Sequence, residues 1–226
     1  MPAHRKKGKR RKADFYPTPY EVALAFVMCL EVAPDARVLE AGAGDGVFVQ
    51  ALYDVHGVKA HALELHEKDH PALLDAPCAS ITWGRFEDHF PAEPYDLVLG
   101  NPPFPIALEF VRHALFCLKQ GGRLAYVLPT SFSHTWERAP FIRESPPRLK
   151  LGFTERPPFD PDLGSNTNSA EYAGYVFERG YQGYTIEEPL AWKHVDCRNA
   201  DVQRIRERHW HGVDCGRRVE CGRRTT

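Results

Sequence analysis

Apolar segments of strand length alternate with segments of helix length along most of the chain, and this order constrains the fold more than any other feature. Strands are predicted at residues 37–40, 58–65, 79–83, 96–99 and 123–128. Helices are predicted before the first strand and after the first, second and fourth strands. This order is typical of a mainly parallel sheet covered on both faces, so we predict a Rossmann-like, doubly wound α/β fold. Ligands of such sheets bind beyond the carboxyl ends of the strands, where the strand order reverses.

The first predicted helix begins with Thr18-Pro19-Tyr20-Glu21, in which threonine caps the helix, proline takes its first position and glutamate completes a capping box. The run at residues 22–32 is apolar on nearly every side, so the helix is expected to be buried. Two aromatic residues, Phe15 and Tyr16, lie just before its N-terminus, where a negatively charged group would be favoured.

A glycine-rich turn, Ala41-Gly42-Ala43-Gly44-Asp45-Gly46, joins the first predicted strand to a helix that begins at about Val47. Glycines let the backbone approach a ligand closely, and the start of a helix supplies unpaired N–H groups. The acids Glu40 and Asp45 would repel a pyrophosphate, but they suit the ammonium and sulfonium groups of S-adenosylmethionine. The turn also lacks the G-x-G-x-x-G spacing of dinucleotide sites.

Acidic and aromatic residues follow the next two predicted strands. Glu64 ends the second strand, 24 residues after Glu40, and an acid at that place is suited to hold a ribose diol with its two oxygens. A solvated surface charge is the alternative. After the third strand, Phe86 could cover an adenine ring, and Asp88 or Glu87 could accept a hydrogen bond from its amino group.

The fourth predicted strand runs into a rigid loop, Asn101-Pro102-Pro103-Phe104. The Asn101 amide oxygen and the Pro102 carbonyl can both accept from one exocyclic amino group, because proline brings an acceptor and no competing N–H. Phe104 adds a flat apolar face, so the loop describes a cradle for a planar ring that carries an amino group. An ordinary turn is the alternative, since Pro-Pro is a common chain breaker. If the first and fourth strands are neighbours at the reversal of strand order, Asp45 and Asn101 open into one crevice.

Residues 130–169 lack a regular pattern and are rich in proline, serine, asparagine and aromatic residues. A long irregular stretch in a compact domain is usually functional or disordered. The candidates for nucleic-acid contact through stacking and phosphate pairing are Phe132, His134, Trp136, Arg138 and Arg156. Alternatively, Phe132 and Trp136 anchor this stretch on the core. A last strand at 171–178 is predicted near the site, antiparallel to the others.

The ends of the chain are basic. Residues 4–12 hold seven lysines and arginines, so the rest of the chain sums to −8 against a net charge of −1. A basic tail at residues 1–12 on an acidic body suggests a polyanionic partner; a solvated tail or a nuclear-import-like signal is the alternative. The C-terminal extension, residues 191–226, is also basic, and its cysteines and histidines include no Cys-x-x-Cys or His-x3-His pair. No metal is therefore predicted.

The composition, 43% hydrophobic and 26% charged, is ordinary for a soluble globular protein. No apolar run reaches membrane-spanning length, and no apolar signal-peptide core follows the basic N-terminus. The six cysteines are most simply explained as reduced residues of an intracellular protein. We therefore predict a cytoplasmic protein without a membrane partner. The oligomeric state is not predicted.

Together these segments resemble the S-adenosylmethionine-dependent amino-methyltransferases of DNA, the N6-adenine and N4-cytosine enzymes. The resemblance covers about residues 13–180 and rests on FYPTP at 15–19, LEAGAGDG at 39–46, Glu64, Phe86, NPPF at 101–104 and YAGYV at 172–176. The NPPF loop is fairly specific for methylation of a planar amino nitrogen. It is not specific for DNA, because RNA guanine and adenine methyltransferases and glutamine-methylating enzymes are similar there.

The resemblance implies a class I methyltransferase domain at residues 13–190, with 130–169 as its target-recognition region. Gly42, Gly44 and Asp45 would surround the methionine part of S-adenosylmethionine, Glu64 the ribose and Phe86 the adenine, while Tyr16 and Thr18 would close over the amino-acid end. The family often has an acid just before the phenylalanine of its third motif. Arg85 stands there in this chain, which moves the predicted adenine contact to Asp88.

The predicted reaction is transfer of a methyl group from S-adenosylmethionine to N6 of adenine in DNA. Asparagine at the head of the loop favours adenine over cytosine, and the aromatic-Thr-Pro segment favours DNA over protein. The target base must be flipped out of the duplex or already single-stranded. An RNA base methyltransferase is the alternative enzyme. A non-catalytic nucleic-acid-binding module is the alternative of another class; a damaged glycine turn or a lost Asn101 would mark it, and the sequence has neither.

Overall fold

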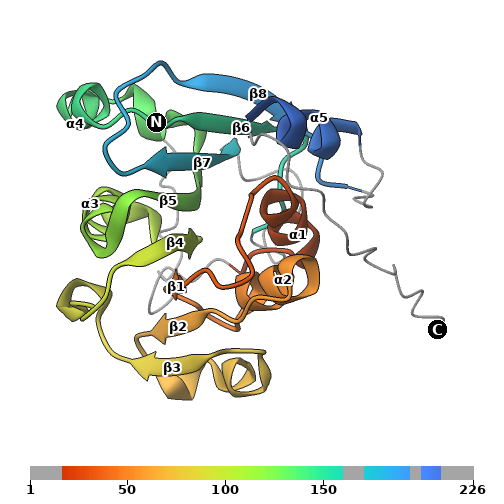
Figure 1. Ribbon diagram of the computed structural model, residues 1–226, viewed down its shortest axis with the longest axis vertical. Coiled ribbons are helices and arrows are strands. Elements are labelled where there is room, and N and C mark those ends of the chain that lie inside the picture. Colours follow the sequence, from red (N-terminus) through yellow and green to blue (C-terminus); the bar gives the residue numbers. More distant parts are fainter. Residues whose placement is uncertain (1–16, 160–170, 194–199, 210–226) are drawn as a thin grey trace, which may run out of the picture.

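The computed structural model describes residues 17–159, 171–193 and 200–209, which include an eight-stranded sheet (Figure 1). The strand order is β3-β2-β1-β4-β5-β7-β6-β8. The strands are β1 (Val38–Ala41), β2 (His61–Glu64), β3 (Ser80–Trp83), β4 (Tyr95–Gly100), β5 (Leu118–Pro129), β6 (Leu149–Phe153), β7 (Tyr172–Glu178) and β8 (Ile186–Leu190). β7 runs antiparallel to both of its neighbours, and the other neighbouring pairs are parallel. The prediction of a mainly parallel sheet with an antiparallel strand at 171–178 is confirmed.

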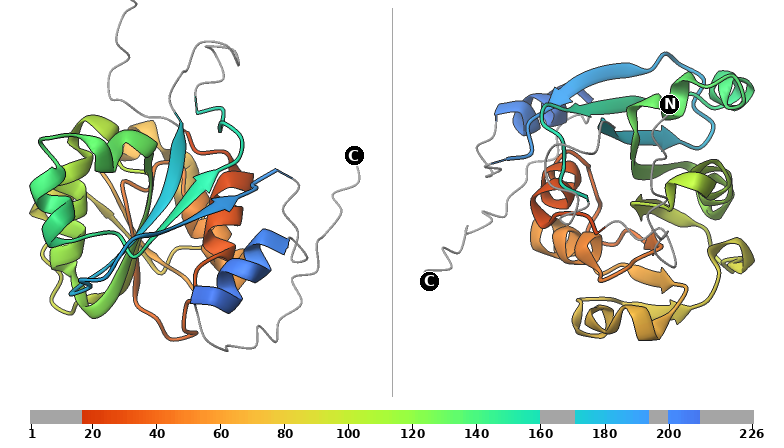
Figure 2. Two further views of the ribbon diagram at one scale, coloured as in Figure 1. Left: turned by 90° about the horizontal axis from the view of Figure 1, so that it is seen from above. Right: turned by 180° about the vertical axis from the view of Figure 1, so that it is seen from behind.

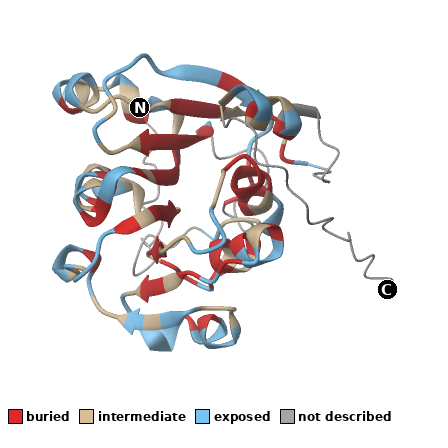
Figure 3. Ribbon diagram, viewed as in Figure 1, coloured by how far each residue is buried: buried red, intermediate tan, exposed pale blue. Residues whose placement is uncertain are grey.

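Helices cover both faces of the sheet, as the predicted doubly wound fold requires (Figures 1 and 2). They are α1 (Tyr20–Met28), α2 (Val47–His56), α3 (Ala107–Cys117), α4 (Ala139–Glu144) and α5 (Ala200–His209). Successive side chains of β4 point to opposite faces, so Leu97 and Leu99 join the core formed with α1, α2 and α5, while Val98 joins the core formed with α3 and α4. Figure 3 shows the resulting buried central strands and the more exposed outer strands β3 and β8.

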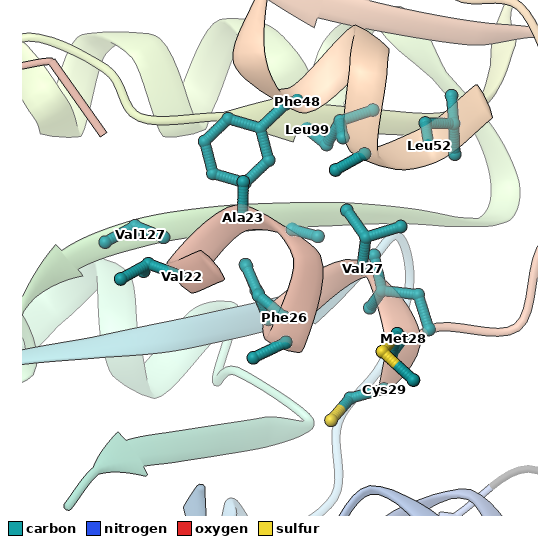
Figure 4. Close-up of a cluster of buried hydrophobic side chains, with 14 of the residues drawn as sticks. Val22, Ala23, Phe26, Val27, Met28, Cys29, Phe48, Leu52, Leu99 and Val127 are labelled. Atoms are coloured by element: carbon teal, nitrogen blue, oxygen red, sulfur yellow. The ribbon is translucent and has the colours of Figure 1, made fainter. Parts of the chain in front are cut away.

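Helix α1 is buried, as its apolar sequence predicts. Its residues Val22, Phe26 and Val27 pack with Phe48 of α2 and Val127 of β5 (Figure 4). The predicted capping box is wrong, because Pro19 occupies the cap position and the helix begins at Tyr20. The hydroxyl of Thr18 instead accepts a hydrogen bond from Asn101.

The strand order reverses between β1 and β4, which are parallel neighbours. β2 and β3 extend the sheet from β1, and β5 extends it from β4. A β-carbon at Gly100, where φ is +144°, would lie 3.3 Å from the carbonyl oxygen of Ala41, so the ends of β1 and β4 approach closely. The glycine turn and the NPPF loop therefore leave the sheet side by side at its carboxyl edge.

Three connections differ from the sequence prediction. Two short 3₁₀ turns, Glu67–Asp69 and Pro71–Asp75, replace the helix expected between β2 and β3. β5 begins at Leu118, five residues before the start of the strand predicted at 123–128, so Gly121 and Gly122 lie inside the strand. Residues 130–169, expected to be irregular, include α4 and β6, which at six and five residues are too short for a clear periodicity.

The C-terminal part of the described chain adds β8 and α5, which the sequence did not reveal. β8 is an edge strand, and its proline and two acids are residues that are uncommon in strands, so its sequence did not predict one. Helix α5 lies within the predicted basic extension and packs on the sheet through Val202 and Ile205. Three basic side chains of α5, Arg204, Arg208 and His209, surround the buried Glu188 of β8. Among the described residues, no helix combines the length and apolarity needed to cross a membrane.

Candidate active site

A cavity of about 1550 Å³ opens at the carboxyl edge of the sheet, where β1 and β4 meet. Its walls come from the segment before α1, the glycine turn, the end of β2 with its connection to β3, the segment after β3, the NPPF loop and the start of α3. Asp45 and Asn101 both line this cavity. The predicted donor and acceptor segments therefore share one space.

Most of the residues predicted to bind the cofactor or to act in catalysis line this cavity. Those lining it are Thr18, Glu40, Gly42, Gly44, Asp45, Glu64, Phe86, Asn101 and Pro103. Among the predicted cofactor-binding and catalytic residues, Asp88, Pro102 and Phe104 lie outside its lining, and Tyr16 is outside the described part of the chain. The predicted nucleic-acid contacts also lie outside it. Asp88 is exposed and lies 3.9 Å from Arg85, whereas Glu87 lines the cavity and also pairs with Arg85. The structure thus places Glu87, the other acid considered for the adenine amino group, at this wall.

The glycine turn is fastened to the end of β2. The amides of Gly42 and Ala43 both donate to the carbonyl of Leu63, and Gly44 N donates to Glu64 Oε2 at 2.8 Å. Gly42 and Gly44 have φ values of +74° and +53°, which residues with a side chain rarely adopt, so this backbone path depends on glycine. The carboxylate of Glu64 is thereby fixed at the cavity wall.

Glu40 is buried in the cavity wall beneath the glycine turn, with 1% of its surface exposed. Its Oε2 accepts from Val49 N at 2.9 Å, and this bond caps α2, because the cap residue Gly46 has no side chain to do so. Burial raises the pKa of Glu40 well above 4.5; the backbone hydrogen bonds oppose this effect, and the nearby charge of Glu64 adds to it. A cation bound beside Glu40 would favour its charged form.

His70 is a cavity residue that sequence reasoning missed. Its Nδ1 lies 3.0 Å from Asp45 Oδ1, so the connection between β2 and β3 holds the glycine turn from the side. His70 is buried, whereas the Asp45 side chain is half exposed. The polar run HEKDH at residues 66–70 was the available signal, since it ends in a histidine just before Pro71.

Asn101 and Phe104 face different surroundings. Asn101 Nδ2 donates to Thr18 Oγ1 at 3.0 Å, which turns the nitrogen end of the amide toward the segment before α1. The Phe104 ring packs at 5.3 Å from Tyr172 and 6.4 Å from Phe159, so it rests against the core beside the cavity. Its role as a stacking surface stays a prediction.

The candidate recognition residues follow the carboxyl ends of β5 and β6, at the same edge of the sheet as the cavity. Phe132 is 1% exposed and packs on Tyr175 and Phe177, so its prediction as a substrate contact is wrong and the anchoring alternative holds for it. Trp136 is 85% exposed. His134 is exposed, and Arg156 lies 3.7 Å from Glu171.

The described residues include no group of three or more histidines, cysteines or acids arranged to hold a metal ion. The cysteines within the described residues are Cys29, Cys78 and Cys117, and the other three of the sequence lie outside the described ranges.

The strand order with an antiparallel β7, and the cavity at the reversal of that order, define the fold of class I S-adenosylmethionine-dependent methyltransferases. Known proteins agree with this assignment, although no protein-family model matches the chain. The chain is 32% identical over 103 residues to the type II methyltransferase M.TthHB8I of Thermus thermophilus, a match that covers 46% of this chain and 24% of that protein. The chain thus spans about a quarter of the curated relative it matches.

Solved structures also share the fold, and two of them serve as examples. A type I restriction-modification methyltransferase subunit from Streptococcus thermophilus superimposes with a TM-score of 0.65 at 17% identity, covering 87% of this chain and 53% of that one. A protein from Listeria monocytogenes, provisionally described as a class I S-adenosylmethionine-dependent methyltransferase, gives a TM-score of 0.64 at 13% identity, covering 81% and 68%. The predicted fold class is confirmed, and the predicted cofactor, S-adenosylmethionine, is the one named in the description of the Listeria protein.

Proposed function

We propose that the chain transfers a methyl group from S-adenosylmethionine to an exocyclic amino nitrogen of a nucleobase, with N6 of adenine in DNA as the target. The observation that carries this proposal is the single cavity lined by both Asp45 and Asn101. The partial match to a type II methyltransferase supports a DNA substrate.

The donor half of the cavity suits S-adenosylmethionine. Glu40 and Asp45 provide negative charge for its ammonium and sulfonium groups, and Glu64 provides carboxylate oxygens for its ribose hydroxyls. Phe86 and Glu87 line the wall beyond Glu64, where an adenine ring would be covered and its amino group accepted. When bound, this cofactor supplies a methyl group made electrophilic by the positively charged sulfur.

The acceptor half positions the amino group. The nitrogen of adenine N6 is a poor nucleophile, because its lone pair is delocalised into the ring. Asn101 Oδ1 and the Pro102 carbonyl would accept its two N–H groups and so favour a lone pair directed at the methyl group. Catalysis then comes from positioning and oriented dipoles, without a general base before transfer.

The target base reaches Asn101 only when it is flipped out or single-stranded, and Phe104 is the ring proposed to stack on it. Stacking of this kind contributes about 1–3 kcal/mol per base. His134, Trp136 and Arg156 are the proposed contacts to the surrounding nucleic acid, because they follow strands that end at the same edge as the cavity.

Incubation with labelled S-adenosylmethionine and four substrates, duplex DNA, single-stranded DNA, structured RNA and protein, tests the proposal when followed by nucleoside analysis. N6-methyladenine in DNA is expected, and Asn101→Ala should abolish it while cofactor binding persists. Gln182→Ala is the matched control. Gln182 lies in the loop between β7 and β8, at the opposite edge of the sheet, and its side-chain amide donates to the backbone carbonyl of Glu144. Label in RNA would favour the alternative enzyme. Cofactor binding without methyl transfer to any of the four would favour the non-catalytic module.

A further inference from the structure

His70 and Asp45 meet at the wall of the cavity, where His70 Nδ1 lies 3.0 Å from Asp45 Oδ1. An ionised carboxylate can only accept, so His70 Nδ1 carries a proton and donates, whether the ring is neutral or positively charged. A flip of the ring would place a carbon against the carboxylate and lose the hydrogen bond. The contact therefore has one direction, from the histidine to the aspartate.

The two partners differ in how firmly they are held. The side chain of His70 is 9% exposed, whereas that of Asp45 is 52% exposed. The His70 carbonyl accepts a hydrogen bond from the amide of Leu73, a residue that is fully buried in the core. A β-carbon at Gly46 would lie 2.9 Å from Leu73 Cδ1, so the segment that carries His70 packs directly on the glycine turn. The histidine is thus the fixed partner, and it restricts the conformations of the aspartate.

The two other acids beside the glycine turn, Glu40 and Glu64, accept hydrogen bonds from backbone amides. Asp45 is instead bonded to the side chain of His70, and it stays half exposed in the cavity. A carboxylate has two oxygens with room for several hydrogen bonds, so Asp45 can pair with a ligand cation while His70 holds it.

We propose that His70 is a positioning residue that holds the Asp45 carboxylate in place for the positively charged part of S-adenosylmethionine. The inference rests on the proposed function and adds to it a residue that strengthens cofactor binding through Asp45. A side chain that is ordered only on binding loses conformational freedom at that moment, whereas a carboxylate already held by a fixed donor loses less. The cofactor should therefore bind more tightly than it would beside an aspartate without this donor.

Two substitutions of nearly the same size test the hydrogen bond. His70→Asn keeps an N–H donor at the place of the ring Nδ1, whereas His70→Leu puts a methyl group there. Both variants lose the rest of the imidazole ring, so a difference between them reports the donated hydrogen bond. In calorimetric titrations with S-adenosylmethionine, we expect Kd to be about three- to tenfold higher for His70→Leu than for His70→Asn. Equal Kd values for the two variants would overturn the proposal.

An uncharged ligand separates positioning from damage to the cavity. 5′-Methylthioadenosine has the adenine, ribose and sulfur of the cofactor but no charged group. Its affinity should be equal in His70→Asn and His70→Leu, because the Asp45 carboxylate has no cation to attract. If the leucine variant weakens both ligands by the same factor, His70 only maintains the shape of the cavity, and the proposal is wrong.

A double-mutant cycle tests whether the effect passes through Asp45. Asp45→Asn replaces the carboxylate with a neutral amide, so in this background the two His70 variants should differ in Kd for S-adenosylmethionine by less than about twofold. A difference that persists at its full size would count against the proposal.

The ring proton can be observed without any cofactor. In ¹⁵N-labelled protein, the histidine ring signals that disappear in His70→Asn identify His70, and its Nδ1 should carry a proton. An unprotonated Nδ1 would exclude the hydrogen bond and with it the proposal. These measurements need no methyl acceptor. If they give the expected results while the wild type methylates none of the four substrates, the proposed function fails and the positioning role stands; if the wild type does not bind S-adenosylmethionine, both fail.

Discussion

The ring of Phe26 in α1 lies so close to Gly174 in β7 that a β-carbon at position 174 would be 2.5 Å from Phe26 Cε2. Real β-carbons essentially never approach another atom so closely, so the helix sits directly on the strand because the strand has no side chain there. This packing also places the segment before α1, and with it Thr18, at the wall of the cavity.

Gly174→Ala should therefore destabilise the protein by about 1–3 kcal/mol, because the new methyl group must displace a fully buried ring. Gly152→Ala in β6 is the matched control, since its β-carbon would lie 4.0 Å from the nearest atom. Urea denaturation measures both free energies of unfolding. Similar losses in the two variants would contradict the importance of the Phe26 contact.

Acid should weaken the fold through His56. Burial lowers its pKa from 6.5 to about 4; the carbonyl of Val27, 3.2 Å from its Nε2, opposes this shift, and the charges of Arg206 and Arg123 add to it. The unfolded chain then binds a proton that the folded chain rejects. The free energy of unfolding should thus fall by up to about 3 kcal/mol as the pH drops from about 6.5 to 4, and be unaffected by this group above that range.

His56→Gln is the variant that checks this pH dependence, because glutamine can still donate to Val27 but does not titrate. Its free energy of unfolding, measured in urea at several pH values, should decline less than that of the wild type between pH 6.5 and 4. Parallel profiles for the two proteins would show that His56 does not carry the effect.

Glu40 should act in the opposite direction. Because burial raises its pKa above 4.5, the folded chain holds a proton that the unfolded chain releases, so stability falls as the pH rises above about 4.5 toward the folded-state pKa. Glu40→Gln removes this titration, and its amide oxygen can still accept from Val49. The gain in free energy of unfolding over the wild type, measured without cofactor, should grow from pH 4 to pH 8. A gap that stays constant with pH would exclude the titration of Glu40 as its cause.

The central sheet could be predicted from the sequence because the strands from β1 to β4 are short segments with apolar or β-branched residues, each followed by a glycine, an acid or a turn. The edge beyond β5 could not. β8 is IEEPL, and it counts as a strand only because β6 pairs with it. Helix α5 is strongly polar along most of its length, and it is attached by two buried apolar residues and by ion pairs with Glu188 of β8, a partner that no local sequence pattern predicts.

The sequence predicted which backbone segments line the cavity, but it did not predict which of their side chains face it. The glycine turn and the NPPF loop have local signatures, and the parallel order of β1 and β4 brings them together. Periodicity does not reveal which of two neighbouring acids faces the cavity, so Glu87 and Asp88 could not be distinguished beforehand. The pairing of Asp45 with His70 likewise arises from tertiary structure.

Trp136 and Phe132, two aromatic residues predicted for the same role, should respond to substitution in different ways. Trp136 is 85% exposed, so Trp136→Ala should leave the free energy of unfolding within about 0.5 kcal/mol of the wild type. If Trp136 stacks on nucleic acid, the same change should cost about 1–3 kcal/mol of binding free energy, roughly a 5- to 150-fold loss of affinity. Phe132→Ala should instead destabilise the fold by about 3–5 kcal/mol, because it empties a buried site against Tyr175 and Phe177.

Tyr184→Ala is the matched control for Trp136→Ala, since Tyr184 is a 93% exposed aromatic residue just before β8, at the opposite edge of the sheet. Fluorescence anisotropy with labelled single-stranded and duplex DNA, at one fixed salt concentration, measures the affinities of both variants. Both variants leave the basic segments of the chain unchanged, so a difference in affinity between them reports the stacking contribution of Trp136. Equal affinities for the two variants would remove Trp136 from the proposed nucleic-acid surface while leaving the assignment of the cavity intact.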